Sequence, residues 1–256
     1  GSPAISALWA DEPVLEALNA MGMIVSASGN HELDAGKAEF LRQIHGGCES
    51  TRPEKACTFR GDYPGSGFPY IASNLIDTTT GERLLPAYHI QQVKGVKIAF
   101  VGAVPRNMEK VVSASAFAGL KATDEAQAIN DVIPELKAKG VNAIIAVMHQ
   151  GGDTVEPFDT QDCSQLSGAV VDVAKRLDPA VDAVISGHSH ASYQCKVGDL
   201  SITQAGKYGH FLTQLKLQVT PGTHHVTNIT ARNIPADPQN YLPNAKLTSL
   251  LEEVRQ

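Results

Sequence analysis

Three short apolar runs, each followed at once by a polar loop that contains glycine, constrain the fold of this 256-residue chain most strongly. The runs cover residues 24–27, 143–148 and 181–185. Short apolar segments bounded by turn residues are typical of buried strands. Stretches with helical periodicity lie between or beside them, at about 11–22, from about 35, at 124–139 and at 164–177. This alternation of strands and helices predicts an α/β fold.

Local signals predict where several other elements begin and end. Asp11 is a candidate N-cap, Pro13 stands in the first helical turn, and Gly22 ends that helix. Pro134 is expected to kink its helix. Further strands are predicted at 69–75, 87–93 and 97–104, a long loop at 46–68, antiparallel strands within 193–232, and a short helix from about Lys246.

The composition argues against several classes of protein. Hydrophobic residues make up 43% of the chain and charged residues 19%, which is typical of a globular protein with a sizeable core. The formal net charge of −6, without any basic run, argues against a nucleic-acid polymer or an anionic membrane as partner. No apolar stretch approaches the roughly 20 residues of a membrane span. We therefore expect a small-molecule ligand, and the sequence does not indicate the oligomeric state.

The organisation of the chain favours one main domain. The sequence contains no internal repeat, no low-complexity segment and no clear linker. We expect a single α/β domain over residues 1–234. Residues 235–256 are expected to form a C-terminal tail with a short helix.

The four cysteines are candidates for disulfide bonds. Cys48 and Cys57 flank a polar segment that is expected to be a surface loop, and Cys163 could pair with Cys195. No C-x-x-C pair is present, which argues against a zinc ribbon or a thioredoxin-like site. Four reduced thiols are the alternative on composition alone, because pairing depends on an oxidising compartment.

Potential ligands follow all three apolar runs. Asn30 and His31 follow the first run, His149 the second, and His188 and His190 the third. Ligands of α/β proteins gather at the carboxyl ends of the strands, so we expect these side chains to meet at one edge. Neutral imidazoles with an amide oxygen suit Zn, Mn, Co or Fe. The His-x-His spacing would let the two rings point to different sides, which suits two neighbouring metal ions.

The simpler interpretation of a single loop histidine is a solvated surface residue. We apply it to five histidines outside the three loops, namely His45, His89, His210, His224 and His225. It is less suitable for the loop histidines as a group, since the same coincidence repeats at three strand ends.

These residues carry a resemblance to a known superfamily. The segment from Gly29 to Asp34 resembles the G-N-H-E-F-D motif of metallophosphoesterases, and Ser186 to His190 resembles their G-H-S-H signature. The surroundings of His149 resemble a third signature of the superfamily. Residues 68–74 and 204–209 are similar to segments of its 5′-nucleotidase branch, and the resemblance covers nearly the whole chain.

The resemblance implies a fold and a role for each site residue. It implies an α/β four-layer sandwich, α-β-β-α with mixed sheets, in which Asn30, His149 and His188 bind one metal ion and His190 binds a second. His31 matches the histidine that stabilises the phosphoryl transition state, and Asp34 matches the carboxylate that orients it. Two divalent ions, Mn, Zn, Co, Mg or Fe, are implied for the complete enzyme, with nucleotides or other phosphate esters as substrates.

The chain also departs from the pattern of the superfamily. Members begin with a strand that carries an Asp-x-His pair, followed by a Gly-Asp motif, and neither is found here in a matching context. Gly61-Asp62 lies in a loop without a preceding apolar strand, and Gly198-Asp199 lies at a hairpin. We expect an upstream segment to be missing from this sequence, so that at most one metal site is well furnished with ligands. We expect a second domain beyond the C-terminal tail to be missing as well.

The sequence therefore predicts a metal-dependent hydrolase of phosphate monoesters, with a 5′-nucleotidase as the main hypothesis. One alternative is a non-catalytic binding module with a degenerate metallophosphoesterase fold. Another is a related esterase acting on 2′,3′-cyclic nucleotides, nucleotide sugars or sulfur esters. The cysteine-containing loops resemble those of secreted relatives, which implies a periplasmic or extracellular protein with disulfides.

Overall fold

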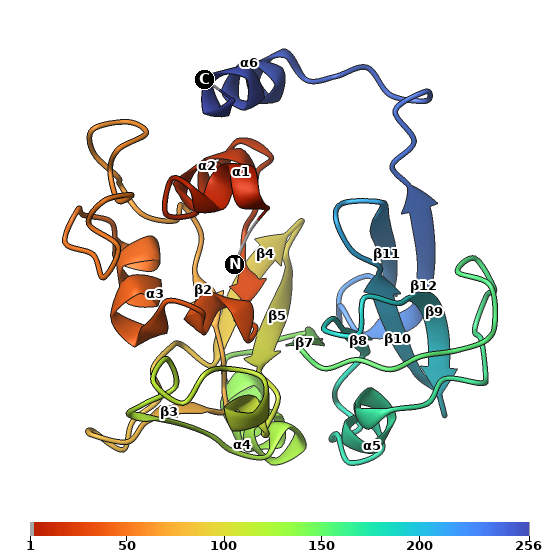
Figure 1. Ribbon diagram of the computed structural model, residues 1–256. Coiled ribbons are helices and arrows are strands. Elements are labelled where there is room, and N and C mark those ends of the chain that lie inside the picture. Colours follow the sequence, from red (N-terminus) through yellow and green to blue (C-terminus); the bar gives the residue numbers. More distant parts are fainter. Residues whose placement is uncertain (1–2, 256) are drawn as a thin grey trace.

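The computed structural model describes residues 3–255 and is built around a six-stranded mixed sheet (Figure 1). Its inner strands are parallel, and an antiparallel strand is added at each edge. In spatial order the strands are β4 (Tyr88–Val93), β5 (Val96–Ala103), β7 (Ala143–Met148), β8 (Ala183–Ile185), β10 (Leu200–Ala205) and β9 (Ser192–Val197).

Two helices cover one face of this sheet. Alternate residues of β5, such as Val101, pack with Ile129 and Ile133 of α4 (Glu125–Ala138) in one buried apolar cluster. The shorter helix α5 (Ala169–Ala174) adds Val170 to the same cluster. Pro134 lies inside α4, as expected. Burial of these aliphatic side chains is the main stabilising contribution on this face.

The opposite face of the sheet carries separate two-stranded pairs. The parallel pair β1 (Ser26–Ala27) and β2 (Tyr70–Ile71) contacts β5 and β7, and the antiparallel pair β11 (Phe211–Val219) and β12 (Val226–Pro235) contacts β9 and β10. A Cβ added at Gly102 of β5 would come within 2.6 Å of the Ile71 carbonyl carbon, so the close approach of β2 requires a glycine there. A third pair, β3 (Leu75–Asp77) with β6 (Leu120–Ala122), lies beyond the end of β2.

Helices α2 (Glu12–Ala20) and α3 (Gly36–His45) pack outside β1 and β2. The ring of Phe40 on α3 meets the ring of Tyr70 edge-on at a centroid distance of 5.2 Å. The predicted α/β class with mixed sheets is confirmed. Within residues 3–255 the second β layer consists of separate two-stranded pieces and not of one continuous sheet.

The C-terminal helix α6 (Ala245–Val254) returns to the N-terminal part of the chain and packs against α2 (Figure 1). Trp9, which follows α1 (Ala4–Ala7), donates from its indole nitrogen to the carbonyl oxygen of Val254 at 3.4 Å. Arg60 forms ion pairs with both Glu16 of α2 and Glu253 of α6. In the part of the chain that the structure describes, no helix combines the length and the apolar character of a membrane span.

Two local predictions hold only in part. Asp11 occupies the N-cap position of α2, as predicted, but it has φ of 67° and its side chain forms no capping hydrogen bond; its carboxylate accepts from Arg52 and Gln43 instead. The helix predicted over 164–177 is limited to Ala169–Ala174. The segment before it is held by a disulfide between Cys163 and Cys195 on β9, and Gly168 interrupts the backbone with φ of 107°.

Both predicted disulfides are present. Cys48 pairs with Cys57 and closes the polar loop after α3, and Cys163 pairs with Cys195. Among the described residues no cysteine is free. The backbone N–H of Cys57 also donates to the buried Glu12 carboxylate at 2.9 Å, which in turn accepts from Arg42. The disulfide loop is therefore anchored to α2 and α3 through a buried ion pair.

Candidate active site

The three loops predicted to bear ligands meet at one end of the sheet. They are residues 28–34 after β1, residues 149–152 after β7, and residues 186–190 after β8. Strands β7 and β8 are parallel neighbours, and β1 packs against β7 from the other layer. Their carboxyl ends thus lie together, which is where α/β proteins bind ligands.

Three potential ligand atoms converge at this point. The Oδ1 atom of Asn30 lies 2.8 Å from Nε2 of His149, and that nitrogen lies 3.3 Å from Nδ1 of His188. Donor atoms that share one divalent ion at roughly 2.1 Å lie about 3 Å from one another. An amide oxygen and two imidazole nitrogens therefore fit a single borderline divalent cation, in both spacing and chemistry.

The protonation of the two histidines also fits ligation. Burial lowers the pKa of His149 to about 4, helped by the neighbouring positive charge of His188, His31 and His190. Burial and the charges of His190 and His31 lower the pKa of His188 as well. The imidazole of His149 is consequently neutral at pH 7, which is the form that binds a metal.

His31 and Asp34 lie beside this cluster, in a short 3-10 turn (His31–Leu33) and directly after it. The His31 Nδ1 atom is 2.9 Å from Asp34 Oδ2, and the two side chains are 58% and 49% exposed. Leu33 between them is fully buried and fixes the turn against the core. The Asp34 carboxylate therefore orients an accessible imidazole ring at the edge of the site.

Glu32 has a structural role in the same loop, as its position suggests. Its Oε2 atom accepts a hydrogen bond of 2.6 Å from the backbone N–H of Gly29. This bond closes the loop on itself and sets the position of Asn30 between the two residues.

We predict that Gly29→Ala disturbs the site directly. A Cβ at residue 29 would lie 2.7 Å from Cε1 of His149 and 2.9 Å from Oε2 of Glu32, so the imidazole has to move. We expect Mn²⁺ affinity, measured calorimetrically, to fall about 10- to 100-fold. Gly187→Ala is the matched control, because its Cβ would make an ordinary contact of 3.6 Å with His149 Nδ1. Equal affinities in both variants would contradict the prediction.

His190 lies near His149 and His188 but outside the group of three converging donor atoms. Its charge acts on both His149 and His188, while its ring is tilted by 51° to the ring of Tyr208 at a centroid distance of 6.3 Å. His188 and His190 both have φ in the left-handed region, at 72° and 62°. The predicted second metal ligand therefore stands apart from the first cluster.

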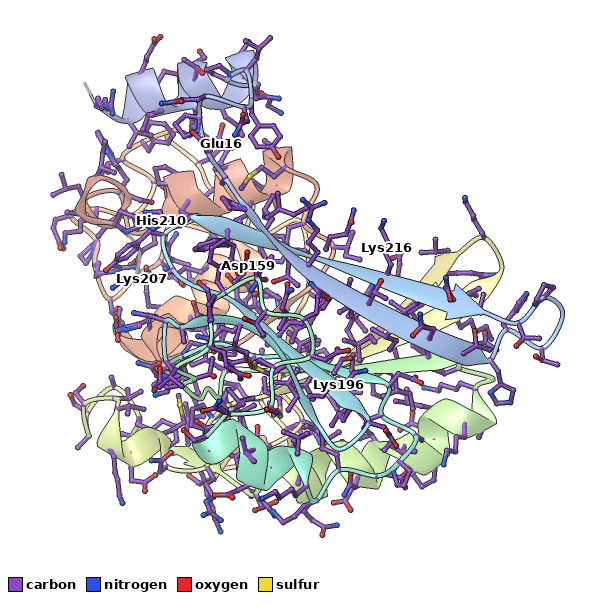
Figure 2. The ribbon with its side chains drawn as sticks, turned by 90° about the vertical axis from the view of Figure 1, so that its right-hand side faces the viewer. Glu16, Asp159, Lys196, Lys207, His210 and Lys216 are labelled. Carbon is purple, nitrogen blue, oxygen red and sulfur yellow. A yellow bond between two sulfur atoms is a disulfide. The ribbon has the colours of Figure 1, made fainter. Side chains whose placement is uncertain are left out.

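A hollow of about 980 Å³ opens beside His31 and His190. Tyr208, which sequence reasoning did not single out, lines it and is 77% exposed. Lys207 and His210 flank Tyr208 at the end of the β11–β12 ribbon (Figure 2). Val14, Leu15 and Leu18 of α2 give the hollow an apolar wall.

Within residues 3–255, neither the other histidines nor the cluster of Glu156, Cys163 and Cys195 adds a second metal site. His45, His210 and His225 are exposed, while His89 and His224 are half-buried outside the three loops. Glu156 lies close to Cys163 and Cys195. The sulfur atoms of that pair are joined in a disulfide and offer no thiolate to a metal.

The chain matches no established family profile, but it is similar to several curated proteins. It is 30% identical to the endonuclease YhcR of Bacillus subtilis over 253 residues, which are 99% of this chain and 20% of YhcR. It is 29% identical to the cell wall protein Lmo0130 of Listeria monocytogenes over 264 residues, 99% of this chain and 33% of that protein. It is 29% identical to a 5′-nucleotidase of Vibrio cholerae over 182 residues, 70% of this chain and 28% of that enzyme. The chain thus spans between a fifth and a third of these relatives.

Solved structures show the same fold. The calcineurin-like phosphoesterase YfkN of Bacillus subtilis superposes with a TM-score of 0.71 at 22% identity, over 98% of this chain and 75% of that one. A 5′-nucleotidase precursor of Thermus thermophilus gives a TM-score of 0.73 at 17% identity, over 98% of this chain and 46% of that one. Fold, ligand loops and relatives agree: the chain has the fold of metallophosphoesterases and is similar in sequence to the branch that includes the 5′-nucleotidases.

Proposed function

We propose that this chain is the phosphoesterase domain of a metal-dependent hydrolase and that nucleoside 5′-monophosphates are its substrates. The observation that carries the proposal is the convergence of Asn30, His149 and His188 beside the His31–Asp34 pair. A set of neutral donors next to a carboxylate-oriented histidine provides both a cation site and a proton donor within one cleft.

The residues have distinct tasks in this mechanism. Asn30 Oδ1, His149 Nε2 and His188 Nδ1 would hold the divalent ion, which when bound neutralises charge on the phosphoryl oxygens. Asp34 accepts from Nδ1–H of His31 at 2.9 Å and so directs the opposite edge of that ring away from the carboxylate. From there His31 can donate to a phosphoryl or leaving-group oxygen as negative charge develops on it.

The hollow beside the site supports an organic leaving group of nucleoside size. Cavities of roughly 300–1,000 Å³ accommodate small organic ligands. With a volume of about 980 Å³, the hollow beside His31 and His190 falls within that range. Its wall combines the apolar residues of α2 with the exposed ring of Tyr208.

A phosphodiester substrate is the second candidate, because the relative YhcR is named an endonuclease and aligns over 99% of this chain. The net charge of −6 argues against extensive contact with a nucleic-acid backbone. Sulfur esters, nucleotide sugars and cyclic nucleotides are further esters that the same site could take.

A substrate panel tests these proposals. The native protein, loaded with Mn²⁺, is incubated with AMP, 2′,3′-cyclic AMP, UDP-glucose, a thiosulfate ester and a single-stranded DNA oligonucleotide. We expect phosphate release from AMP at the highest kcat/KM. A preference for the oligonucleotide would replace the 5′-nucleotidase proposal by a nuclease. No turnover on any of them would favour the non-catalytic binding module.

We also propose that the protein acts outside the cytoplasm. Two disulfides join its four cysteines, and disulfides persist in oxidising compartments. A cell wall protein is among its relatives. Alkylation of the protein taken from its host without reductant should label no cysteine, and labelling of all four would contradict the proposal.

A further inference from the structure

The loop that bears His188 and His190 has a conformation that its own sequence does not favour. Both histidines have positive φ, and left-handed backbone is costly for residues other than glycine. Such a conformation persists only where the surroundings determine it. The loop must therefore be held from outside by contacts of other elements.

Gln204, at the end of β10, lies directly behind this loop. It is 2% exposed, and its side-chain amide bonds to residues on either side of His188. Its Nε2 atom donates to Ser189 Oγ at 3.0 Å, and its Oε1 atom lies 3.4 Å from Ser186 Oγ. The amide thus spans the two serines of the Ser-Gly-His-Ser turn.

Tyr193 of β9 completes the network. Its hydroxyl donates to Gln204 Oε1 at 3.1 Å and lies 2.7 Å from Ser186 Oγ. Tyr193 is fully buried, and burial raises its pKa to about 12, so the hydroxyl stays protonated and can donate. These hydrogen bonds can all form at once: Ser186 donates to Tyr193, Tyr193 donates to Gln204, and Gln204 donates to Ser189.

The last hydrogen bond of this network reaches the loop of His149. Ser189 Oγ donates to the carbonyl oxygen of Gly152 at 2.7 Å and so connects the loop after β8 to the loop after β7. The backbone N–H of Gly187 also donates to the carbonyl oxygen of Gln150 at 3.3 Å. The network therefore fixes one ligand loop against the other, and with them the 3.3 Å separation of His149 Nε2 and His188 Nδ1.

We propose that Gln204 is a positioning residue for the metal site, which acts through Ser189 and Ser186 to hold His188 in register with His149. The inference rests on the proposed function, because it assigns Gln204 to the cation site described above. Partners that orient metal ligands without touching the metal commonly change metal affinity when they are lost. A buried network that is fully bonded also specifies a single geometry.

The test compares two buried glutamines on paired strands. Gln204→Met removes the amide at similar length. Gln194→Met does the same at Gln194, which pairs with Thr203 and is 3% exposed. Gln194 bonds to Asp159 O and to the N–H of Asn233, away from both ligand loops. Both variants lose buried hydrogen bonds, so only a specific positioning role separates them.

We expect Gln204→Met to raise the Kd for Mn²⁺, measured calorimetrically in phosphate-free buffer, about 10- to 100-fold. Gln194→Met should change it less than about twofold, at a comparable loss of Tm. With AMP as substrate, the Mn²⁺ concentration for half-maximal rate should rise in Gln204→Met, and saturating Mn²⁺ should restore kcat. A rate that saturating Mn²⁺ does not restore would contradict a positioning role.

Should Gln204→Met fail to fold, Tyr193→Phe removes only one hydroxyl of the same chain and should weaken Mn²⁺ binding to a smaller extent. An unchanged Kd in the folded variants, or an equal rise in Gln194→Met, would overturn the inference. Wild-type protein that binds Mn²⁺ but does not hydrolyse AMP would count against the proposed function alone, since the Kd comparison is made without substrate.

Discussion

Replacing His149 with alanine is expected to abolish divalent-metal binding in the micromolar range and, with it, phosphate release. His149 Nε2 is the middle donor of the cluster, with Asn30 Oδ1 at 2.8 Å and His188 Nδ1 at 3.3 Å. Its loss removes one of three converging ligands and leaves the other two without a common neighbour. Because losing even an outer partner costs 10- to 100-fold in affinity, we expect a loss of at least about 100-fold in Mn²⁺ affinity, measured by calorimetry.

A control separates ligation from general damage to the fold. His45→Ala removes an exposed imidazole at the end of α3, outside the three ligand loops, and should leave Mn²⁺ affinity unchanged. His149→Ala should still unfold cooperatively, since the β7 core beside it is aliphatic. Wild-type Mn²⁺ affinity in folded His149→Ala would show that the ion binds elsewhere.

Replacing His31 with alanine is expected to lower kcat on AMP about 10²- to 10³-fold while leaving Mn²⁺ affinity nearly unchanged. His31 is not among the three converging donors, and its ring is oriented by Asp34 at the open edge of the site. Loss of one positioned donor to a developing oxyanion has an effect of this size. Steady-state kinetics at saturating Mn²⁺ measure it, and calorimetry supplies the affinity.

Asp34→Asn refines this prediction. The amide keeps the shape of the side chain but removes the negative charge that faces Nδ1 of His31 at 2.9 Å. We expect a smaller loss of kcat, about tenfold, because the ring is retained but less firmly oriented. A His31→Ala variant that lowers Mn²⁺ affinity and kcat together would indicate a ligand role, contrary to the assignment made here.

The sequence predicted those parts of the fold that depend on local pattern. The strand-loop order places Asn30, His149 and His188 at strand ends, and the structure brings the three together. This was predictable because parallel strands direct their carboxyl ends to one edge of a sheet. The expected positions of α4 and β7 follow from strong periodicity and an uninterrupted apolar run.

Features that depend on tertiary contacts were not predictable. Asp11 has the residue type and position of a helix cap, yet Arg52, 41 residues away, binds its carboxylate instead. Helix α5 is shorter than predicted because a disulfide links Cys163 to β9, and helix propensity takes no account of such a link. Gln204 begins a segment that resembles the 5′-nucleotidase branch, and Tyr193 falls among the predicted antiparallel strands, but neither pattern indicates a contact with the ligand loop. Only the structure places the two side chains behind that loop.

The measurement that tests the account most directly is phosphate release from AMP by chelator-treated native protein during titration with Mn²⁺. We predict no release without metal, a saturable rise with added Mn²⁺, and loss of the response in His149→Ala. Release that is independent of metal, or that persists in folded His149→Ala, would contradict the assignment of Asn30, His149 and His188 as the metal-binding centre of a phosphoesterase.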